Sequence, residues 1–430
     1  GSSNAVIANA AGAVTASTAA TIAQANTIAG FATSVTYSIS DVAANIAAGA
    51  GLNEAVNITI TDDVTIAQAT TIENATNSGS KSVATITDTA AAIAGSSNAV
   101  LANAAGAVTA STAATIAQAN TIAGFATSVT YSISDVAANI AAGAGLNEAV
   151  NITITDDVTI AQATTIENAT NSGSKSVATI TDTAAAIAGS SNAVIANAAG
   201  AVTASTAATI AQTNAIAGFA TSVTYSISDV AANIAAGAGL NEAVNITITD
   251  DVTIAQATTI ENATNSGSKS VATITDTAAA IAGSSNAVIA NAAVAVTAST
   301  AATIAQANTI AGFATSVTYS ISDVAANIAA GAGLNEAVNI TITDDVTIAQ
   351  ATTIENATNS GSKSVATITD TAAAIAGSSN AVIANAAGAV TASTAATIAQ
   401  AGAIDAFATA VVFAVADTAA AIAGSNDAAL

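Results

Sequence analysis

The carboxylates of Asp and Glu are the side chains of this sequence that could take part in the most kinds of chemistry, because it contains no His and no Cys. Nucleophilic triads and zinc sites need His or Cys in nearly all their forms, so both classes are excluded. The adjacent pair Asp62 and Asp63 remains a candidate for general acid–base work. The pair recurs identically at 156–157, 250–251 and 344–345. A specialised active site is not expected in four copies, and no GxGxxG or P-loop motif is present. We therefore expect no enzyme activity and no catalytic residues.

Four acids in each repeat are the candidate calcium ligands, because Ca²⁺ prefers oxygen ligands. In the first repeat they are Asp41, Asp62, Asp63 and Asp88. Their spacing matches no known calcium loop. An Asp or Ser directly before an Ala-rich run is also a helix N-cap signal, and capping accounts for these residues without a metal. We expect no cofactor, with calcium as the alternative.

A repeat of 94 residues positions these side chains, since the segment beginning Gly1-Ser2-Ser3-Asn4 returns four times. The sequence therefore predicts one continuous array in place of separate globular domains. Its units are 1–94, 95–188, 189–282 and 283–376, followed by a partial unit at 377–430. Val294 stands where the first unit has Gly12. Because Val tolerates positive φ poorly, that position is not expected to need a left-handed turn.

Each unit divides into four imperfect coils, which Ser17, Asp41, Asp62 and Asp88 punctuate. Before each Asp, apolar and polar side chains alternate with the period of a strand. The apolar set is expected to face the core and the Thr and Ser set to face solvent or a partner. In two of the coils the apolar set is Val35, Tyr37, Ile39, Val56, Ile58 and Ile60.

After each cap, an Ala-rich run has roughly helical spacing, which predicts a short helix of about two turns. The order strand, cap, short helix and return loop predicts an α/β solenoid with a geometry like that of leucine-rich repeats. An all-β solenoid is the alternative, favoured by the many Thr, Ile and Val residues.

The net charge of −23, with four Lys and no Arg, limits the partners. Nucleic-acid binding needs cations that displace counterions, so it is not expected, and neither is binding to anionic membranes. We interpret the acidity as a source of solubility that limits lateral clumping. No apolar run reaches membrane length. The chain begins without Met and in phase with its repeat, so we expect it to be a processed or excised portion.

Three short strings carry a resemblance to a known family: Ser40–Ala47 (SDVAANIA), Asp88–Ala94 (DTAAAIA) and Thr65–Ile72 (TIAQATTI). They resemble the Ala/Thr-rich "SDTAANIA" and "VAQATTI" repeats of very large bacterial surface proteins, notably cyanobacterial ones. The resemblance covers essentially the whole chain. It implies an extracellular or cell-surface location and an adhesive or filamentous role, and it brings no catalytic residues.

The last strand departs from the repeat. Phe413 replaces the residue equivalent to Tyr37, while Val412, Ala414 and Ala416 replace outward Thr and Ser residues. A strand that is apolar on both faces should be covered on both, either as a terminal cap or by another chain. The candidate interface there is Val411, Val412, Phe413, Ala414, Val415 and Ala416. The segment 424–430 echoes residues 1–7, which makes Ser2, Ser3 and Asn4 candidates at the other end.

These observations predict a structural protein, a subunit or section of an extracellular filament that self-associates head to tail. One alternative is the stalk of a giant cell-surface adhesin. Another is a solenoid surface that binds calcium, or ice through the outward pairs Thr59-x-Thr61 and Thr85-x-Thr87. Neighbouring coils offer Val14-x-Ala16 and Ser38-x-Ser40, which interrupt that ladder, and the ordinary strand preference of Thr explains the pairs.

Overall fold

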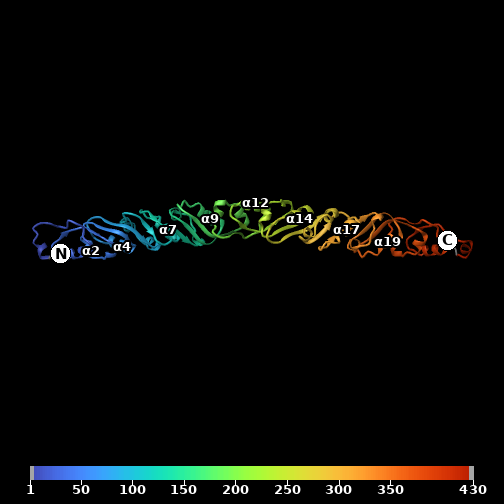
Figure 1. Cartoon of the computed structure of the whole chain (residues 1–430), viewed down its shortest axis with the longest axis horizontal. Helices are drawn as coiled ribbons and strands as arrows, with labels where there is room; N and C mark the ends of the chain where they lie inside the picture. The colour runs from blue at the N-terminus through green and yellow to red at the C-terminus, as the bar shows by residue number, and fades with distance from the viewer. Residues whose placement is uncertain (1–3, 426–430) are drawn as a thin grey trace. The chain divides into compact units, whose positions relative to one another are not determined.

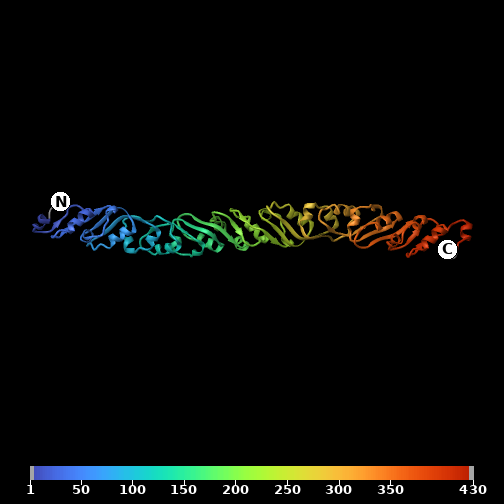
Figure 2. The same ribbon diagram turned by 90° about the horizontal axis from the view of Figure 1, so that it is seen from below.

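The structure, a computed structural model, describes residues 4–425 of the chain. It contains two compact units, Gly1–Thr206 with Gly218–Thr224, and Ala207–Ala217 with Tyr225–Leu430. Both consist of the same coil repeated, a parallel strand followed by a short helix, as the ribbons of Figure 1 show. The view in Figure 2 shows the same alternation from a second side. The fold is therefore an α/β repeat solenoid, as predicted, and the boundary between the two units lies inside the third sequence repeat.

Four coil types, here named A to D in chain order, make up each repeat. The A coils contain β1 (Val14–Thr15), β6 (Val108–Ala110), β11 (Val202–Ala204), β16 (Ala292–Ala298) and β21 (Val390–Ala392). Their helices are α2 (Ile22–Ala29), α7 (Ile116–Ile122), α12 (Ile210–Ile216), α17 (Ile304–Ile310) and α22 (Ile398–Asp405). The C coils contain β4 (Ile58–Val64), β9 (Ile152–Val158), β14 (Ile246–Val252) and β19 (Ile340–Val346). Their helices are α4 (Ile66–Glu73), α9 (Ile160–Glu167), α14 (Ile254–Glu261) and α19 (Ile348–Glu355).

The D coils have one strand and two short helices. The strands are β5 (Lys81–Asp88), β10 (Lys175–Asp182), β15 (Lys269–Asp276) and β20 (Lys363–Asp370). The first helices are α5 (Ala90–Ala94), α10 (Ala184–Ala188), α15 (Ala278–Ala282) and α20 (Ala372–Ala376). The second helices are α6 (Asn98–Ala102), α11 (Asn192–Ala196), α16 (Asn286–Ala290) and α21 (Asn380–Ala384), and α1 (Asn4–Ala8) is their equivalent at the start. The last coil contains β22 (Val411–Val412) and α23 (Ala419–Ala423).

The B coils split their strand into two. The pairs are β2 (Val35–Thr36) and β3 (Ile39–Asp41), β7 (Val129–Thr130) and β8 (Ile133–Asp135), β12 (Val223–Thr224) and β13 (Ile227–Asp229), and β17 (Val317–Thr318) and β18 (Ile321–Asp323). Each B coil continues into a 3₁₀ turn and one helical turn. The 3₁₀ turns are Ala43–Asn45, Ala137–Asn139, Ala231–Asn233 and Ala325–Asn327. The helical turns are α3 (Ala50–Asn53), α8 (Ala144–Asn147), α13 (Ala238–Asn241) and α18 (Ala332–Asn335).

The two-turn helix predicted after Asp41 was wrong, because this backbone runs against the helix of the preceding A coil. A Cβ on Gly51 would lie 2.5 Å from the backbone N of Asn26, closer than real Cβ atoms approach. Only glycine fits there, and glycine weakens a helix.

The register of the parallel ladder explains the period of four coils. In the first B coil, β2 pairs with the preceding coil, where Val35 lies opposite Val14. Strand β3 pairs with the following coil, where Ile39 lies opposite Ile58. The five-stranded sheets therefore run from one B coil to the next, in the order β3-β4-β5-β6-β7 in the first case. One sheet ends at the first strand of a B coil and the next sheet begins at its second strand, once in every repeat.

The predicted strand faces are confirmed. Ile39, Ile58 and Ile60 are buried, and Ser40 and Thr59 are exposed.

Buried Tyr37 donates its hydroxyl to the carbonyl oxygen of Gly51 at 2.9 Å, so its polar atom is satisfied. Burial, assisted by the charge of Glu54, raises the pKa of Tyr37 to about 12. The same arrangement recurs in Tyr131, Tyr225 and Tyr319. One tyrosine in each repeat therefore anchors the split B strand to the helical turn that follows it.

Val294 confirms that a left-handed turn is not required at the position of Gly12. No residue among 4–425 has its φ in the left-handed region. Space is nevertheless short in sister units, where a Cβ on Gly106 would lie 2.8 Å from the carbonyl oxygen of Ala84. The Val294 repeat avoids this clash by extending β16 to seven residues, which leaves the Val294 side chain 78% exposed.

Candidate functional site

The Asp residues proposed as caps or calcium ligands cap helices, but in the preceding coil. Asp41 Oδ2 accepts the amide of Ile22, the first residue of α2, at 2.8 Å. Asp88 Oδ2 accepts the amide of Ile66, the first residue of α4, at 2.9 Å, and Asp62 Oδ1 accepts that of Ala43 at 2.6 Å. Each strand end thus completes the helix of the coil before it.

The fourth junction uses a hydroxyl instead of a carboxylate. Thr112 Oγ1 accepts the amide of Ala90, the first residue of α5, at 3.1 Å. The predicted cap Ser17 and its equivalents are therefore one residue early.

The N-caps of the A, C and first D helices are threonines such as Thr21, Thr65 and Thr89. Gln24 completes a capping box with Thr21, and Gln68 completes one with Thr65. The expectation that the Asp residues cap their own helices was wrong, because Thr occupies the cap position directly after or near the strand end.

The Asp41 carboxylate is committed to N–H donors. Besides Ile22, it accepts the amide of Val42 and the side-chain amide of Asn45, both at 2.8 Å, and it is 8% exposed. Burial acts to raise the pKa of Asp41, but the hydrogen bonds from Asn45, Ile22 and Val42 outweigh it and hold the pKa below its ordinary value. Asp41 does not fit a calcium site, because both of its carboxylate oxygens already accept hydrogen bonds from N–H groups.

The other acidic side chains either accept hydrogen bonds or lie apart from further carboxylates. Asp63 Oδ1 accepts the hydroxyl of Thr85 at 2.7 Å on the exposed face. Within residues 4–425, three or more carboxylates nowhere converge as a metal site would require.

The single base of each repeat is tied down between two coils. Lys81 Nζ donates to the carbonyl oxygen of Glu73 and lies 3.7 Å from its carboxylate, which also accepts Asn103 Nδ2 at 2.9 Å. Such half-exposed ion pairs contribute little stability, but they leave the remaining acids to set the surface potential.

The outward threonines form only short rows: Thr87, Thr109 and Thr130 pair in succession across three coils. The interruption expected from Val14-x-Ala16 was wrong, because the equivalent Val108 is buried and faces inward. Other coils do break the row. In the ladder Thr59 lies between Ser40 and Ser82, and Thr61 donates its hydroxyl to the carbonyl oxygen of Asp41 at 3.2 Å. Part of the hydroxyl set is therefore used inside the protein.

Four hollows of about 220 Å³ recur on the surface, one in each repeat. In the first repeat the hollow is lined by Ala48, Gly49, Leu52, Asn53, Thr71, Asn74 and Ala75. The lining contains no titratable side chain to act as an acid or base, and the hydroxyl of its one threonine, Thr71, donates to the carbonyl oxygen of Ala67.

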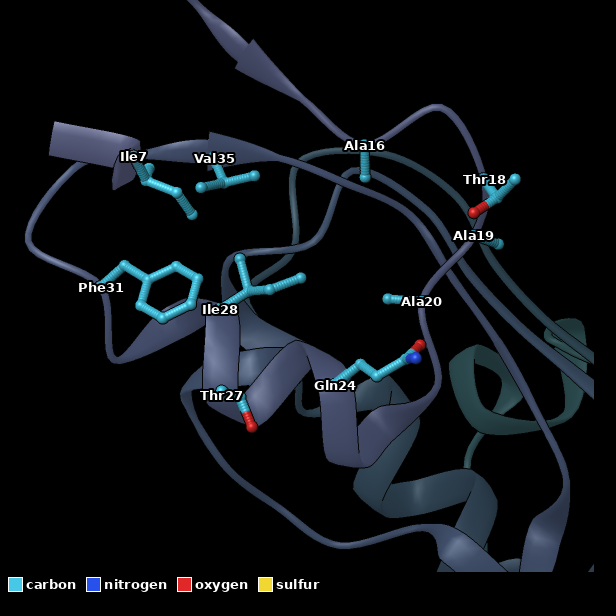
Figure 3. A pocket seen from close by; sticks show the side chains of 10 residues that line it. All are labelled: Ile7, Ala16, Thr18, Ala19, Ala20, Gln24, Thr27, Ile28, Phe31 and Val35. Carbon is cyan, nitrogen blue, oxygen red and sulfur yellow. The ribbon is translucent and has the colours of Figure 1, made fainter. Parts of the chain in front are cut away.

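The first described coil has a larger cavity, of about 490 Å³, with a mostly apolar wall. In Figure 3, Ile7 and Val35 lie across the cavity from Ile28 and Phe31. Its lining is Ile7, Ala16, Thr18, Ala19, Ala20, Gln24, Thr27, Ile28, Phe31 and Val35. In the second repeat, the residues equivalent to Ile7 and Ile28 are Leu101 and Ile122, and both are buried.

The last coil also exposes apolar side chains. Of the predicted interface, Val412, Ala414 and Ala416 are exposed, with Val412 at 62%, while Val411, Phe413 and Val415 are half-buried. At the other end, exposed Asn4 accepts the amide of Ala32 at 2.9 Å, and Ser2 and Ser3 lie outside the described residues.

Sequence reasoning missed Ile422, which is 40% exposed in α23. The segment Asp417–Ser425 is identical to Asp88–Ser96 of the first D coil, where the equivalent Ile93 is fully buried. That identity was the available signal, and the same signal exists for Ile28 and Phe31, whose segment is identical to the one that contains Ile122 and Phe125.

Comparison with known proteins adds no family. No family model and no curated protein matches the chain. Among solved structures, the leucine-rich-repeat ectodomain of the Arabidopsis receptor kinase HAESA, in complex with an extended IDA peptide hormone, aligns at 8% identity and a TM-score of 0.15. The alignment covers 86% of this chain and 60% of the ectodomain, and a likeness at this level says nothing about function. None of the helices within residues 4–425 is long and apolar enough to cross a membrane.

Proposed function

We propose that this chain is a structural protein, a subunit or section of an extracellular filament whose copies join head to tail. The observation that carries the proposal is the exposure of apolar side chains on both end coils. Ile28 is only half-buried and Ile422 is 40% exposed there, whereas their equivalents Ile122 and Ile93 are buried. Apolar faces of this kind mark interaction sites on soluble proteins.

A solenoid suits a mechanical role because each coil interacts with its neighbours in the same sheet. Backbone hydrogen bonds join every coil to the next within each sheet, and the layers of Ile, Val and Ala beneath them exclude water. A head-to-tail contact that does not close extends such an array without limit.

The acidic surface favours end contacts over side contacts. At −23 the copies repel one another laterally, and the same charge disfavours nucleic acid and anionic membranes as partners. The resemblance of the repeats to those of giant bacterial surface proteins supports the extracellular location. The stalk of a cell-surface adhesin is the second candidate, which the same repeats favour.

Negative-stain electron microscopy of the purified chain over a concentration series tests the proposal. Filaments of uniform width that lengthen with concentration are expected, and sedimentation velocity should report the same growth. Single particles at every concentration up to about 100 µM would overturn self-assembly and favour the stalk. Raising salt should not dissolve the filaments, since an apolar joint gains strength as charge repulsion is screened.

A further inference from the structure

We infer that the last coil of one copy docks on the first coil of a second copy with the register of an internal D-to-A junction. This rests on the proposed function and specifies its joint. The internal junction occurs four times within the described chain, which provides a template for the contact.

The template has three elements. In the ladder, Ile86 pairs with Val108 and Thr87 with Thr109. The amide that opens α5, that of Ala90, donates to Thr112 Oγ1 at 3.1 Å. Helix α5 packs on α7, and Ile93 of α5 is fully buried there.

The last coil receives its predecessor as a B coil does. Val411 pairs with Val390, Val415 bridges to Ala396, and Asp417 Oδ2 accepts the amide of Ile398 at 3.0 Å. These contacts match those of Val35, Ile39 and Asp41 in the first repeat.

Beyond Asp417, however, the coil carries the sequence of a D coil. Thr418 caps α23 as Thr89 caps α5, and the helix sequence AAAIA is the same. The last coil therefore joins its own chain like a B coil and presents outward the helix of a D coil, whose successor in every repeat is an A coil.

The first described coil is an A coil with its D-facing side open. Thr18 corresponds to Thr112, Val14 to Val108, and Ile28 to Ile122 of α7. The cavity of about 490 Å³ lies on this side, between α2 and the strand residues. Helix α1, which is equivalent to the second helix of a D coil, directly precedes this A coil in the same copy. One complete D coil is thus assembled from two copies, α23 from one and α1 from the other.

The register follows by equivalence. Val415 of one copy pairs with Val14 of the next, Ala416 pairs with Thr15, and the amide of Ala419 donates to Thr18 Oγ1. The side chain of Ile422 is buried against α2, as Ile93 is against α7.

Disulfide trapping tests the register, and the absence of native Cys makes it clean. Ala416→Cys with Thr15→Cys places two Cα atoms ~4.8 Å apart on neighbouring strands, within disulfide range. Ala414→Cys with Thr15→Cys is the matched control, because its pair lies about 8 Å apart. Mild oxidation should link the first variant into a ladder of multimers at least tenfold faster than the second. Equal rates would overturn the register.

Ile422→Asp tests the joint itself and should raise the critical concentration for assembly at least about a hundredfold, because it would bury an unpaired charge. Ala420→Asp is the control, since its equivalent Ala91 is exposed in the internal junction. Both variants should keep the circular dichroism of the native chain, as both positions are exposed in one copy.

The outcomes separate the joint from the proposed function. Filaments that survive Ile422→Asp would overturn this joint and leave the filament standing. An unmodified chain that never assembles would overturn both, and it would assign the open A coil to a preceding coil of a longer chain.

Discussion

The cross-coil carboxylate of the B coil should be a main source of stability. Replacing Asp41 by Asn keeps its shape but turns one oxygen into an N–H donor. The variant amide can keep Val42 and Asn45 on its remaining oxygen, and it then points a donor at the amide of Ile22. A buried hydrogen bond to a charged group contributes about 1.5–3 kcal/mol, so we expect a loss of about 2 kcal/mol per site.

The measurement is urea unfolding followed by circular dichroism at pH 7, on chains changed in all four repeats. In a solenoid the site losses add approximately, to about 8 kcal/mol. The test set is Asp41, Asp135, Asp229 and Asp323 changed to Asn. The control set is Asp63, Asp157, Asp251 and Asp345 changed to Asn, which alters the charge equally but on the exposed face. The control should cost less than about 2 kcal/mol in total.

The pH dependence supplies a second readout. Because the folded pKa of Asp41 lies below its unfolded value, its stabilisation is fully present above about pH 4 and is lost as pH falls through the folded pKa. The gap between the unmodified chain and the Asp41 set should therefore shrink as the pH falls below about 4. A gap that does not depend on pH, or a control set that costs as much, would refute the reasoning.

Three further changes have distinct expected outcomes. Tyr37 and its equivalents should ionise near pH 12 by absorbance at 295 nm; because burial raises their pKa, their stabilisation is complete below pH 10 and declines as pH rises to 12. Gly51→Ala should lower the melting temperature, at a cost of about 1–3 kcal/mol, because its Cβ meets the backbone of Asn26, whereas Gly12→Ala, with nothing within 4 Å, should change stability by less than about 1 kcal/mol. Val294→Gly should shorten β16 and speed amide exchange at residues 292–295 by at least about tenfold, with little change in global stability.

The strand faces were predictable because alternation in a half-buried strand is a local property. Tyr37 and Ile39 face inward and Thr36 faces outward, as the sequence pattern requires. The repeat also fixed the order of coils, since each 94-residue unit folds in the same way. Local pattern and burial therefore determine most of the fold.

The partners of the acids were not predictable, because a cap supplied by the next coil leaves no local signature. Asp41 lies 19 residues from Ile22, the start of the helix that it caps. Thr21 directly precedes that helix and can also accept hydrogen bonds from its amides. The shortened helix of the B coil depended on the approach of Gly51 to Asn26, which only the stacked structure reveals. Ile422 was identifiable from repeat identity alone, but its exposure was not.

Because helices are capped by residues of the following coil, the coils can be completed only in their order along the chain. Helices α2 and α4 receive the acceptor for their first amide from Asp41 and Asp88, residues that the ribosome adds later. A nascent chain therefore always has one incomplete coil at its growing edge, and each coil is finished only when its successor has been made. Folding should advance from the N-terminus in step with synthesis, one coil behind the newest strand.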